Sequence, residues 1–307
     1  MALTANANFL RYALVALGLF FVSTQANAAN CGTAGANNCF WIGGTGTLDD
    51  ATDSAHWSNT TGGTTCSCEP LSGNNNLVFD ASSGGGTVTP NVNWTTASTS
   101  TVTTTGFTGT IDFSTNNNSW TVGSWLATSG TQTLNLGTGT LTTTGSSGLN
   151  IQVAAMTLIA SSSTYTNTNT IGNTTLALQS TMSLGNIVFA ANTQTLLTNS
   201  WTIAGTVTGT APFSVTGQSG STTTLSGTAF NLTSTAASPI SILSAGSAAT
   251  WTLSTTSGGT ITWGVVLNII KAGAGTITVS NCLKAGNSGS GVTCNAPSGG
   301  GGRIIGG

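Results

Sequence analysis

Between Phe113 and Ile270 the sequence contains no charged residue. Instead, apolar residues alternate with Thr, Ser and Asn in short segments that Gly, Asn or Ser clusters separate. A period of two indicates strands with one buried face, and Thr, Ser, Asn and Gly all disfavour helix. The segments with this alternation are 109–113, 132–136, 149–153, 175–178, 186–189, 201–204, 213–215, 224–226, 240–242, 251–253, 260–263 and 276–279. The chain is therefore expected to be all-β.

The composition excludes several classes of protein. Only 3% of the residues are charged, but 38% are hydrophobic and the mean hydropathy is +0.22, which does not fit an intrinsically disordered chain. The 42 glycines follow no G-x-y period, so the chain is not collagen-like. A formal net charge of −2, with only four Lys and Arg residues, leaves no basic face for nucleic acid.

Three all-β architectures are compatible with many short strands: a sandwich, a propeller and a solenoid. A sandwich of this length would normally form two domains, and no linker is evident; blade signatures of a propeller are also missing. Repeated coils with inward Leu, Ile and Val and outward Thr, Ser and Asn suit a solenoid, because stacking buries an apolar row that one coil cannot bury alone. We therefore predict a parallel β-helix whose two ends are capped.

The N-terminus has the pattern of a secretory signal peptide. Arg11 precedes an apolar run over residues 13–22, and Ala26-Asn27-Ala28 follows as an A-x-A cleavage site. The run is too short for the roughly 20 apolar residues of a membrane-spanning helix. We predict a signal-peptide helix over residues 1–28, no transmembrane anchor, and a secreted or cell-surface protein.

The cysteines agree with an oxidising compartment, because their number is even and all lie after the predicted signal peptide. Cys282 and Cys294 are expected to pair. The other four allow three connectivities, and a Cys66–Cys68 bond is disfavoured because strand residues i and i+2 lie too far apart. A zinc site is the rival interpretation of these four, but spacings of eight and two do not match the usual C-x₂₋₄-C pairs. The six are Cys31, Cys39, Cys66, Cys68, Cys282 and Cys294.

These observations divide the mature chain into four regions. Residues 29–95 are predicted to form an N-terminal cap and residues 96–281 the β-solenoid. Residues 282–298 are predicted to form a C-terminal disulfide loop, and residues 299–307 a Gly-rich tail.

One block near the N-terminus resembles a known group of proteins. Phe40-Trp41-Ile42-Gly43-Gly44-Thr45-Gly46-Thr47 is followed by His56-Trp57-Ser58, Pro70 and Leu77-Val78-Phe79-Asp80-Ala81. The block is similar to the W-x-G-G-x-G…H-W-S…P…F-D-A opening of β-strand-repeat proteins, which occur among exported bacterial surface proteins and phage or viral structural proteins. Residues 131–142, 240–244, 251–254 and 259–261 resemble the internal repeat of that group. Leu48, in place of an aromatic residue, and the added cysteines depart from it.

The resemblance implies a parallel β-helix with a surface or virion-structural role and no enzyme activity. Separately, the two exposed ends of a solenoid must be capped, and the residues of this block lie in the predicted N-terminal cap. The cap residues singled out are Trp41, Gly43, Gly44, His56, Trp57, Phe79 and Asp80.

The sequence offers little catalytic chemistry. Glycan hydrolysis by acid–base catalysis needs two carboxylates at one bond, and no Asp or Glu follows Asp112. The one dense group is Asp49, Asp50, Asp53 and His56, which could hold Ca²⁺ or another metal ion but lacks the order of an EF-hand loop. A turn-rich cap is the favoured interpretation of this group. With no G-x-S-x-G motif either, we expect no enzyme activity, no metal and no cofactor.

Three functions fit these expectations. The first is a non-enzymatic, exported structural or adhesive solenoid whose partners are surface glycans or other copies of itself. The second is a virion structural protein, associated with a tail spike or fibre. The third and weakest is an ice-binding solenoid, since its Thr-x-Thr pairs do not recur at one fixed interval. Five tryptophans would bind sugars only if exposed, and core packing is the favoured role for Trp120, Trp125, Trp201, Trp251 and Trp263.

Overall fold

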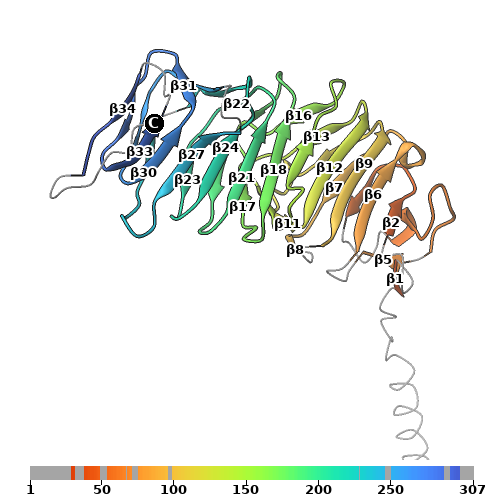
Figure 1. The fold of residues 1–307 in the computed structure, drawn as a ribbon. Helices are drawn as coiled ribbons and strands as arrows, with labels where there is room; N and C mark the ends of the chain where they lie inside the picture. Colours follow the sequence, from red (N-terminus) through yellow and green to blue (C-terminus); the bar gives the residue numbers. More distant parts are fainter. Residues whose placement is uncertain are drawn as a thin grey trace, which may run out of the picture.

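A computed structural model describes residues 29–31, 38–48, 54–66, 68–70, 75–95, 99–227, 229–245, 250–286 and 291–297. They form an elongated β-solenoid of about eight turns, with β1 and β2 near one end and β33 and β34 at the other (Figure 1). The helices described are two single turns of 3-10 helix, η1 (Ser54–His56) and η2 (Ala81–Ser83). The predictions of an all-β chain and of a parallel solenoid are confirmed.

One continuous sheet of 12 strands, called sheet 1, runs along the whole solenoid. Its strands pair in parallel from coil to coil, except that β4 pairs antiparallel with β2 at the N-terminal end. From β4 inward the strands are β4 (Trp57–Ser58), β2 (Asn38–Trp41), β6 (Asn76–Asp80), β9 (Thr101–Phe107), β12 (Ser124–Gly130), β15 (Leu149–Ile151), β18 (Asn173–Leu178), β21 (Gln194–Thr198), β24 (Ser214–Gly217), β27 (Ile240–Ser244), β30 (Gly264–Leu267) and β33 (Cys282–Gly286).

The second side of the solenoid is made by two sheets in succession. Sheet 2 contains β3 (Gly46–Leu48), β7 (Thr87–Pro90), β10 (Thr110–Asp112), β13 (Thr133–Asn135) and β16 (Thr157–Ile159). From the next coil onward, sheet 4 takes its place, with β19 (Ser183–Leu184), β22 (Trp201–Ile203), β25 (Thr222–Leu225), β28 (Trp251–Thr255) and β31 (Ile269–Ala272). The hydrogen-bonded ladder on this side is thus interrupted between β16 and β19.

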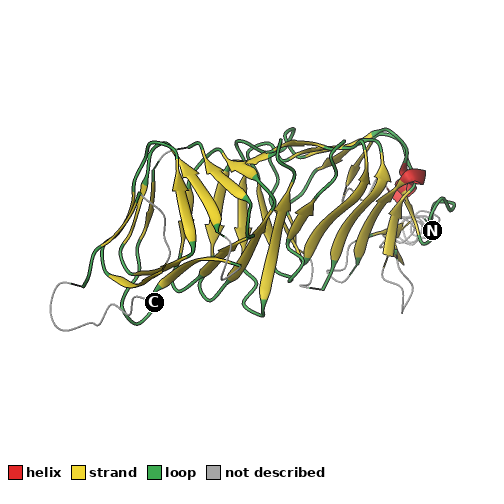
Figure 2. Cartoon of the chain, turned by 45° about the horizontal axis from the view of Figure 1, so that its top comes forward, coloured by secondary structure: helices red, strands yellow, loops and turns green. Residues whose placement is uncertain are grey.

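The third side is divided in the same way, two coils further along. Sheet 3 contains β8 (Trp94–Thr95), β11 (Trp120–Val122), β14 (Thr140–Thr143), β17 (Thr164–Asn167), β20 (Asn186–Phe189) and β23 (Val207–Gly209). Sheet 5 continues with β26 (Phe230–Leu232), β29 (Gly259–Ile261), β32 (Ile277–Val279) and β34 (Val292–Cys294). A separate pair, β1 (Ala29–Asn30) and β5 (Cys68–Glu69), lies at the N-terminal end. Figure 2 shows the loops that connect the sides at the corners of each coil.

The core consists of apolar rows that run along the axis. In sheet 1 one row places Val102, Trp125, Leu149 and Leu176 opposite one another on successive strands, all buried. Neighbouring strands lie about 4.8 Å apart, so each side chain of a row packs on the next. Fully burying one such side chain stabilises the fold by about 1.5–3 kcal/mol, and the long stack repeats that contribution at every coil.

Candidate functional site

The predicted cap residues meet in one aromatic cluster at the N-terminal end. The Trp41 and His56 rings stack with centroids 4.7 Å apart and planes 12° apart. Trp57 meets Trp41 edge to face at 5.2 Å, and Phe79 contacts both tryptophans. We call Trp41, His56, Trp57 and Phe79 the aromatic cap. Its three larger hydrophobic rings are almost fully buried, which closes the apolar core at this end.

The remaining predicted cap residues hold the turns around this cluster. Gly43 and Gly44 have φ values of 101° and 86°, a region that side chains other than glycine rarely adopt. The Gly43 carbonyl lies 3.2 Å from His56 Nδ1. Asp80 caps η2, because its carboxylate accepts a hydrogen bond from the Ser82 N–H at 2.8 Å. Each of these contacts supports a turn of the backbone.

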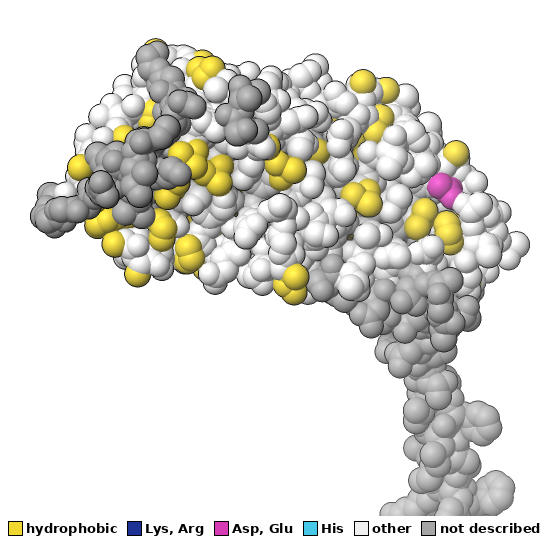
Figure 3. All heavy atoms as spheres, viewed as in Figure 1, with side chains coloured by type: hydrophobic (Ala, Val, Ile, Leu, Met, Phe, Trp, Pro, Cys, Tyr) yellow, Lys and Arg dark blue, Asp and Glu magenta, His cyan; other side chains and the backbone are white. Residues whose placement is uncertain are grey.

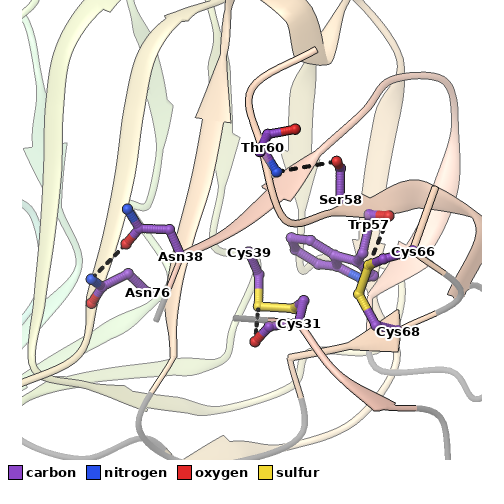
Figure 4. The surroundings of a disulfide bond; sticks show 9 residues. All are labelled: Cys31, Asn38, Cys39, Trp57, Ser58, Thr60, Cys66, Cys68 and Asn76. Atoms are coloured by element: carbon purple, nitrogen blue, oxygen red, sulfur yellow. Dashed lines mark hydrogen bonds between the residues drawn. A yellow bond between two sulfur atoms is a disulfide. The ribbon is translucent and has the colours of Figure 1, made fainter. Parts of the chain in front are cut away.

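Disulfides lie at both ends of the solenoid: Cys31–Cys39 and Cys66–Cys68 near the aromatic cap (Figure 4), and Cys282–Cys294 at the other end. The predicted Cys282–Cys294 pairing is confirmed. The expectation that Cys66 and Cys68 do not pair was wrong. It assumed an extended strand, but Cys66 precedes β5 and its Cα lies 5.1 Å from that of Cys68, within the range of a disulfide.

Charged side chains are scarce on the described surface. Those described are Asp80, Asp112 and Lys271, and the described residues on the face in Figure 3 are white or yellow apart from one acidic spot. Asp112 accepts hydrogen bonds from the Ser114 N–H and hydroxyl at 2.9 and 2.6 Å, so it too supports a turn. Among the described residues, no group of three His, Cys, Asp or Glu side chains lies close enough to hold a metal ion. Asp49, Asp50 and Asp53 lie outside the described residues.

The tryptophans named as candidates for sugar stacking take core positions. Trp120, Trp125, Trp201 and Trp251 are 0–2% exposed, and Trp263 is partly buried. Their faces are covered by the apolar rows and by other rings, as where Trp120 meets Phe113 edge to face at 4.9 Å. Core packing is confirmed for the first four.

An open groove, which was not predicted from the sequence, is formed by the loops that follow successive strands of sheet 1. Four amide residues line it, and each is the first residue after a strand of sheet 1: Gln152 after β15, Gln179 after β18, Asn199 after β21 and Gln218 after β24. Four serines and Gly220 complete the lining, and the groove has a volume of about 420 Å³. We call it the amide groove. Its signal in the sequence is the amide that recurs at one strand end, which is visible only once the strand ends are known.

A second regular surface lies on the outer face of sheet 3. Thr140 and Thr142 of β14 pair in register with Thr164 and Thr166 of β17, and Thr121 of β11 pairs with Thr142. All five are partly exposed, between buried neighbours such as Leu141 and Tyr165. We call these five residues the Thr array. Its repeats are about 4.8 Å across the strands and about 6.6 Å along them.

Comparison with known proteins gives no further guide to these surfaces. No protein-family model, no curated protein and no solved structure matches the chain. In the part of the chain that the structure describes, no helix is both long and apolar enough to cross a membrane.

Proposed function

We propose that the protein is a non-enzymatic, exported structural or adhesive β-solenoid, displayed at a cell surface or in an extracellular assembly. The N-terminal signal-peptide pattern supports export. Three disulfides, with every cysteine of the chain paired, fit an oxidising setting. The similarity of the Trp41 to Ala81 block to β-strand-repeat proteins supports a surface role.

The observation that carries the proposal is the uncharged polar surface of a long, rigid stack. Thr, Ser and Asn occupy the partly exposed positions of strands such as β13, β14 and β24, whereas the alternate positions are buried. Such a surface presents many hydrogen-bonding groups, and it lacks the net charge by which most proteins repel one another. It suits a molecule that contacts glycans or packs beside copies of itself.

Quantitative peptide mass spectrometry on separated fractions tests this proposal. The fractions are cytoplasm, periplasm, washed cell surface, culture supernatant and purified virions. We expect the protein at the surface or in the supernatant, with a mature N-terminus near Ala29. Unprocessed protein concentrated in virions would overturn the proposal and make the chain a tail-associated or capsid-associated part.

One observation favours a second candidate, an ice-binding solenoid. The Thr-x-Thr pairs recur at unequal sequence intervals, yet Thr140 and Thr142 face Thr164 and Thr166 in register. A rigid array of hydroxyl and methyl groups with two fixed repeats can hold a layer of ordered water, and ordered bridging water is bound at little cost. The Thr array is therefore regularly spaced in the structure, although the intervals between its residues in the sequence are unequal.

Thermal hysteresis of the purified protein tests this second candidate. We expect Thr142→Lys to abolish any hysteresis, because its long charged side chain interrupts the array. Thr175→Lys, at a partly exposed threonine of sheet 1 that pairs with Leu196, is the matched control and should retain it. Absence of hysteresis in the unaltered protein removes this candidate.

A further inference from the structure

We propose that the amide groove binds a neutral, hydroxyl-rich polysaccharide chain laid along the solenoid axis. This inference rests on the proposed adhesive function and names its partner. Amides are strong recognition groups for hydroxyls, because each carries an acceptor oxygen and two N–H donors. In this groove they recur on four successive coils of the stack.

The groove lies where the second side of the solenoid changes from sheet 2 to sheet 4. Gln152 leads into β16, the last strand of sheet 2, whereas Gln179 leads into β19, the first strand of sheet 4. Asn199 and Gln218 lead into β22 and β25, which continue sheet 4. Because the ladder is interrupted here, the corner is free to open into a hollow with four amides along it.

The groove amides are partly fixed by hydrogen bonds within the protein. Gln152 Nε2 donates to Asn150 Oδ1 at 2.8 Å, and Gln179 Nε2 donates to the Gln152 carbonyl. The Asn199 N–H donates to Gln218 Oε1 at 2.7 Å. A side chain fixed by one atom loses less freedom when its other atom binds a ligand.

Other polar atoms of these carboxamides make no hydrogen bond to any described residue of the protein and can bind a ligand. Within the described part of the chain, Gln179 Oε1, Gln218 Nε2 and the Asn199 carboxamide make no hydrogen bond. All three residues line the same open hollow. The groove thus presents both acceptors and donors, the combination that a sugar hydroxyl satisfies because it donates one hydrogen bond and accepts others.

The dimensions and charge of the groove narrow the ligand class. Four coils at a rise of about 4.8 Å place the first and last amide about 14 Å apart along the axis, which favours an extended chain over a single small sugar. No Lys, Arg, Asp or Glu lines the groove, so an anionic polysaccharide would lose hydration without gaining an opposite charge. Trp201, beside Ser200, is 2% exposed, so recognition relies on hydrogen bonds rather than on ring stacking.

An NMR titration of the full mature protein with linear hexasaccharides tests the proposal. The neutral probes are maltohexaose, cellohexaose, mannohexaose and xylohexaose, and hexagalacturonate is the anionic comparison. We expect at least one neutral probe to shift the side-chain amide signals of Gln152, Gln179, Asn199 and Gln218, and hexagalacturonate to leave them unchanged. Shifts confined to other amides, shifts by hexagalacturonate alone, or no shift with any probe would overturn it.

Variants localise the binding independently. Gln179→Ala combined with Gln218→Ala should weaken binding about tenfold, since two hydrogen bonds of ordinary strength are lost. Ser180→Trp fills the groove from its exposed rim without removing a described hydrogen bond, so it should also block binding if the double variant folds poorly. Asn173→Ala removes an exposed amide at the opposite end of β18 and should bind normally.

These results separate the inference from the proposed function. If the protein is found at the cell surface but binds none of the neutral probes, the proposed structural function stands and the proposal for the amide groove is rejected. Equal binding by the unaltered protein and both groove variants would place the glycan elsewhere on the solenoid and reject the amide groove. A protein confined to virions would reject the proposed function whatever the groove binds.

Discussion

The hydroxyls of Thr143 and Tyr165 lie 2.6 Å apart inside the core, on adjacent strands of sheet 3. Both side chains are completely buried, and Thr143 pairs in register with Asn167, another fully buried polar residue. Burial raises the pKa of Tyr165 above its usual value of about 10, and the hydrogen bond with Thr143 offsets only part of that rise. The phenol therefore stays protonated in the folded chain at a pH where an unfolded tyrosine ionises.

The first prediction concerns alkaline pH. A raised folded-state pKa leaves stability intact below about pH 10 and removes it as pH rises further, because only the unfolded state releases the proton. We expect the free energy of unfolding to fall by about 1.4 kcal/mol per pH unit from this group above pH 10. Urea unfolding at pH 8 to 12 measures it, and tyrosinate absorbance reports Tyr165 directly because the other tyrosine, Tyr12, lies in the predicted signal peptide.

The matched variant is Tyr165→Phe. It should lose about 1 kcal/mol at neutral pH, because Thr143 is left without its partner, but it should not show the added alkaline loss. Identical pH dependence in the two proteins would show that Tyr165 does not control alkaline unfolding.

The second prediction concerns a missing side chain. Gly217 follows Leu197 in an inward row of sheet 1, and a Cβ built on it would lie 1.9 Å from the Trp251 ring. The indole occupies the space that a larger residue would take. Gly217→Ala should lower the free energy of unfolding by about 1–3 kcal/mol through overpacking.

The control for this overpacking is Gly85→Ala. Its Cβ would meet the Thr108 hydroxyl at 3.6 Å, an ordinary contact, and the backbone there is not left-handed. Thermal unfolding compares the two variants. If Gly85→Ala destabilises the protein as much as Gly217→Ala, crowding against Trp251 is not the cause.

The third prediction ranks two disulfides by the loop that each closes. Cys282 and Cys294 are 12 residues apart, whereas Cys66 and Cys68 are 2 apart. Stabilisation by a crosslink grows with the length of the loop in the chain-entropy account. Replacing both cysteines of the longer loop by Ser should lower the free energy of unfolding by about 3 kcal/mol, and the same change at Cys66 and Cys68 by clearly less.

Urea unfolding of the two double variants measures the ranking, and peptide mapping without reduction checks the pairing itself. Three crosslinked peptides are expected, corresponding to the three disulfides of the structure. A Cys31–Cys66 or Cys39–Cys68 crosslink would contradict the pairing at the N-terminal cap.

The fourth prediction concerns the aromatic cap. Trp41→Ala should lower the free energy of unfolding by about 3–5 kcal/mol, because it empties a fully buried site between three other rings. His56→Ala removes the stacked ring and the contact with the Gly43 carbonyl but empties less of the core, so it should lower the free energy of unfolding by less, about 0.5–1.5 kcal/mol. Hydrogen exchange should show the loss of protection concentrated in β2, β4 and β6; uniform loss along the solenoid would argue against a local cap.

Several strands whose large apolar residues alternate with polar ones could be predicted from the sequence. β30 and β31, with sequences GVVL and IIKA, were not predicted, and neither were strands dominated by Thr. The segment predicted at 186–189 coincides with β20, and that at 149–153 contains β15. β14 and β17, with sequences TLTT and TYTN, were absent from the prediction because a single large residue gives little alternation. Pairing with their neighbours, rather than their own pattern, makes them strands.

The Thr array and the amide groove depend on strand register, which cannot be read from the sequence because the coils differ in length. Thr121 and Thr142 are paired although 21 residues separate them, and Thr142 and Thr166 are paired across 24. The corner loops absorb the difference, so a search for one fixed interval misses the Thr array. The amide groove was missed for the same reason, since its residues align only when each strand end is known. The pairing of Cys66 with Cys68 was misjudged because their Cα atoms lie only 5.1 Å apart, within the range of a disulfide.

The scarcity of charged residues bears on how the stability and binding of this protein depend on salt concentration. Four basic and six acidic residues in 307 leave few ion pairs for dissolved salt to screen, and packing and neutral hydrogen bonds hold the stack together. Its shape and its contacts should be nearly the same in fresh water and in brine. The affinity of a surface that binds through opposite charges falls as the salt concentration rises, whereas the affinity of this uncharged surface should depend little on salt.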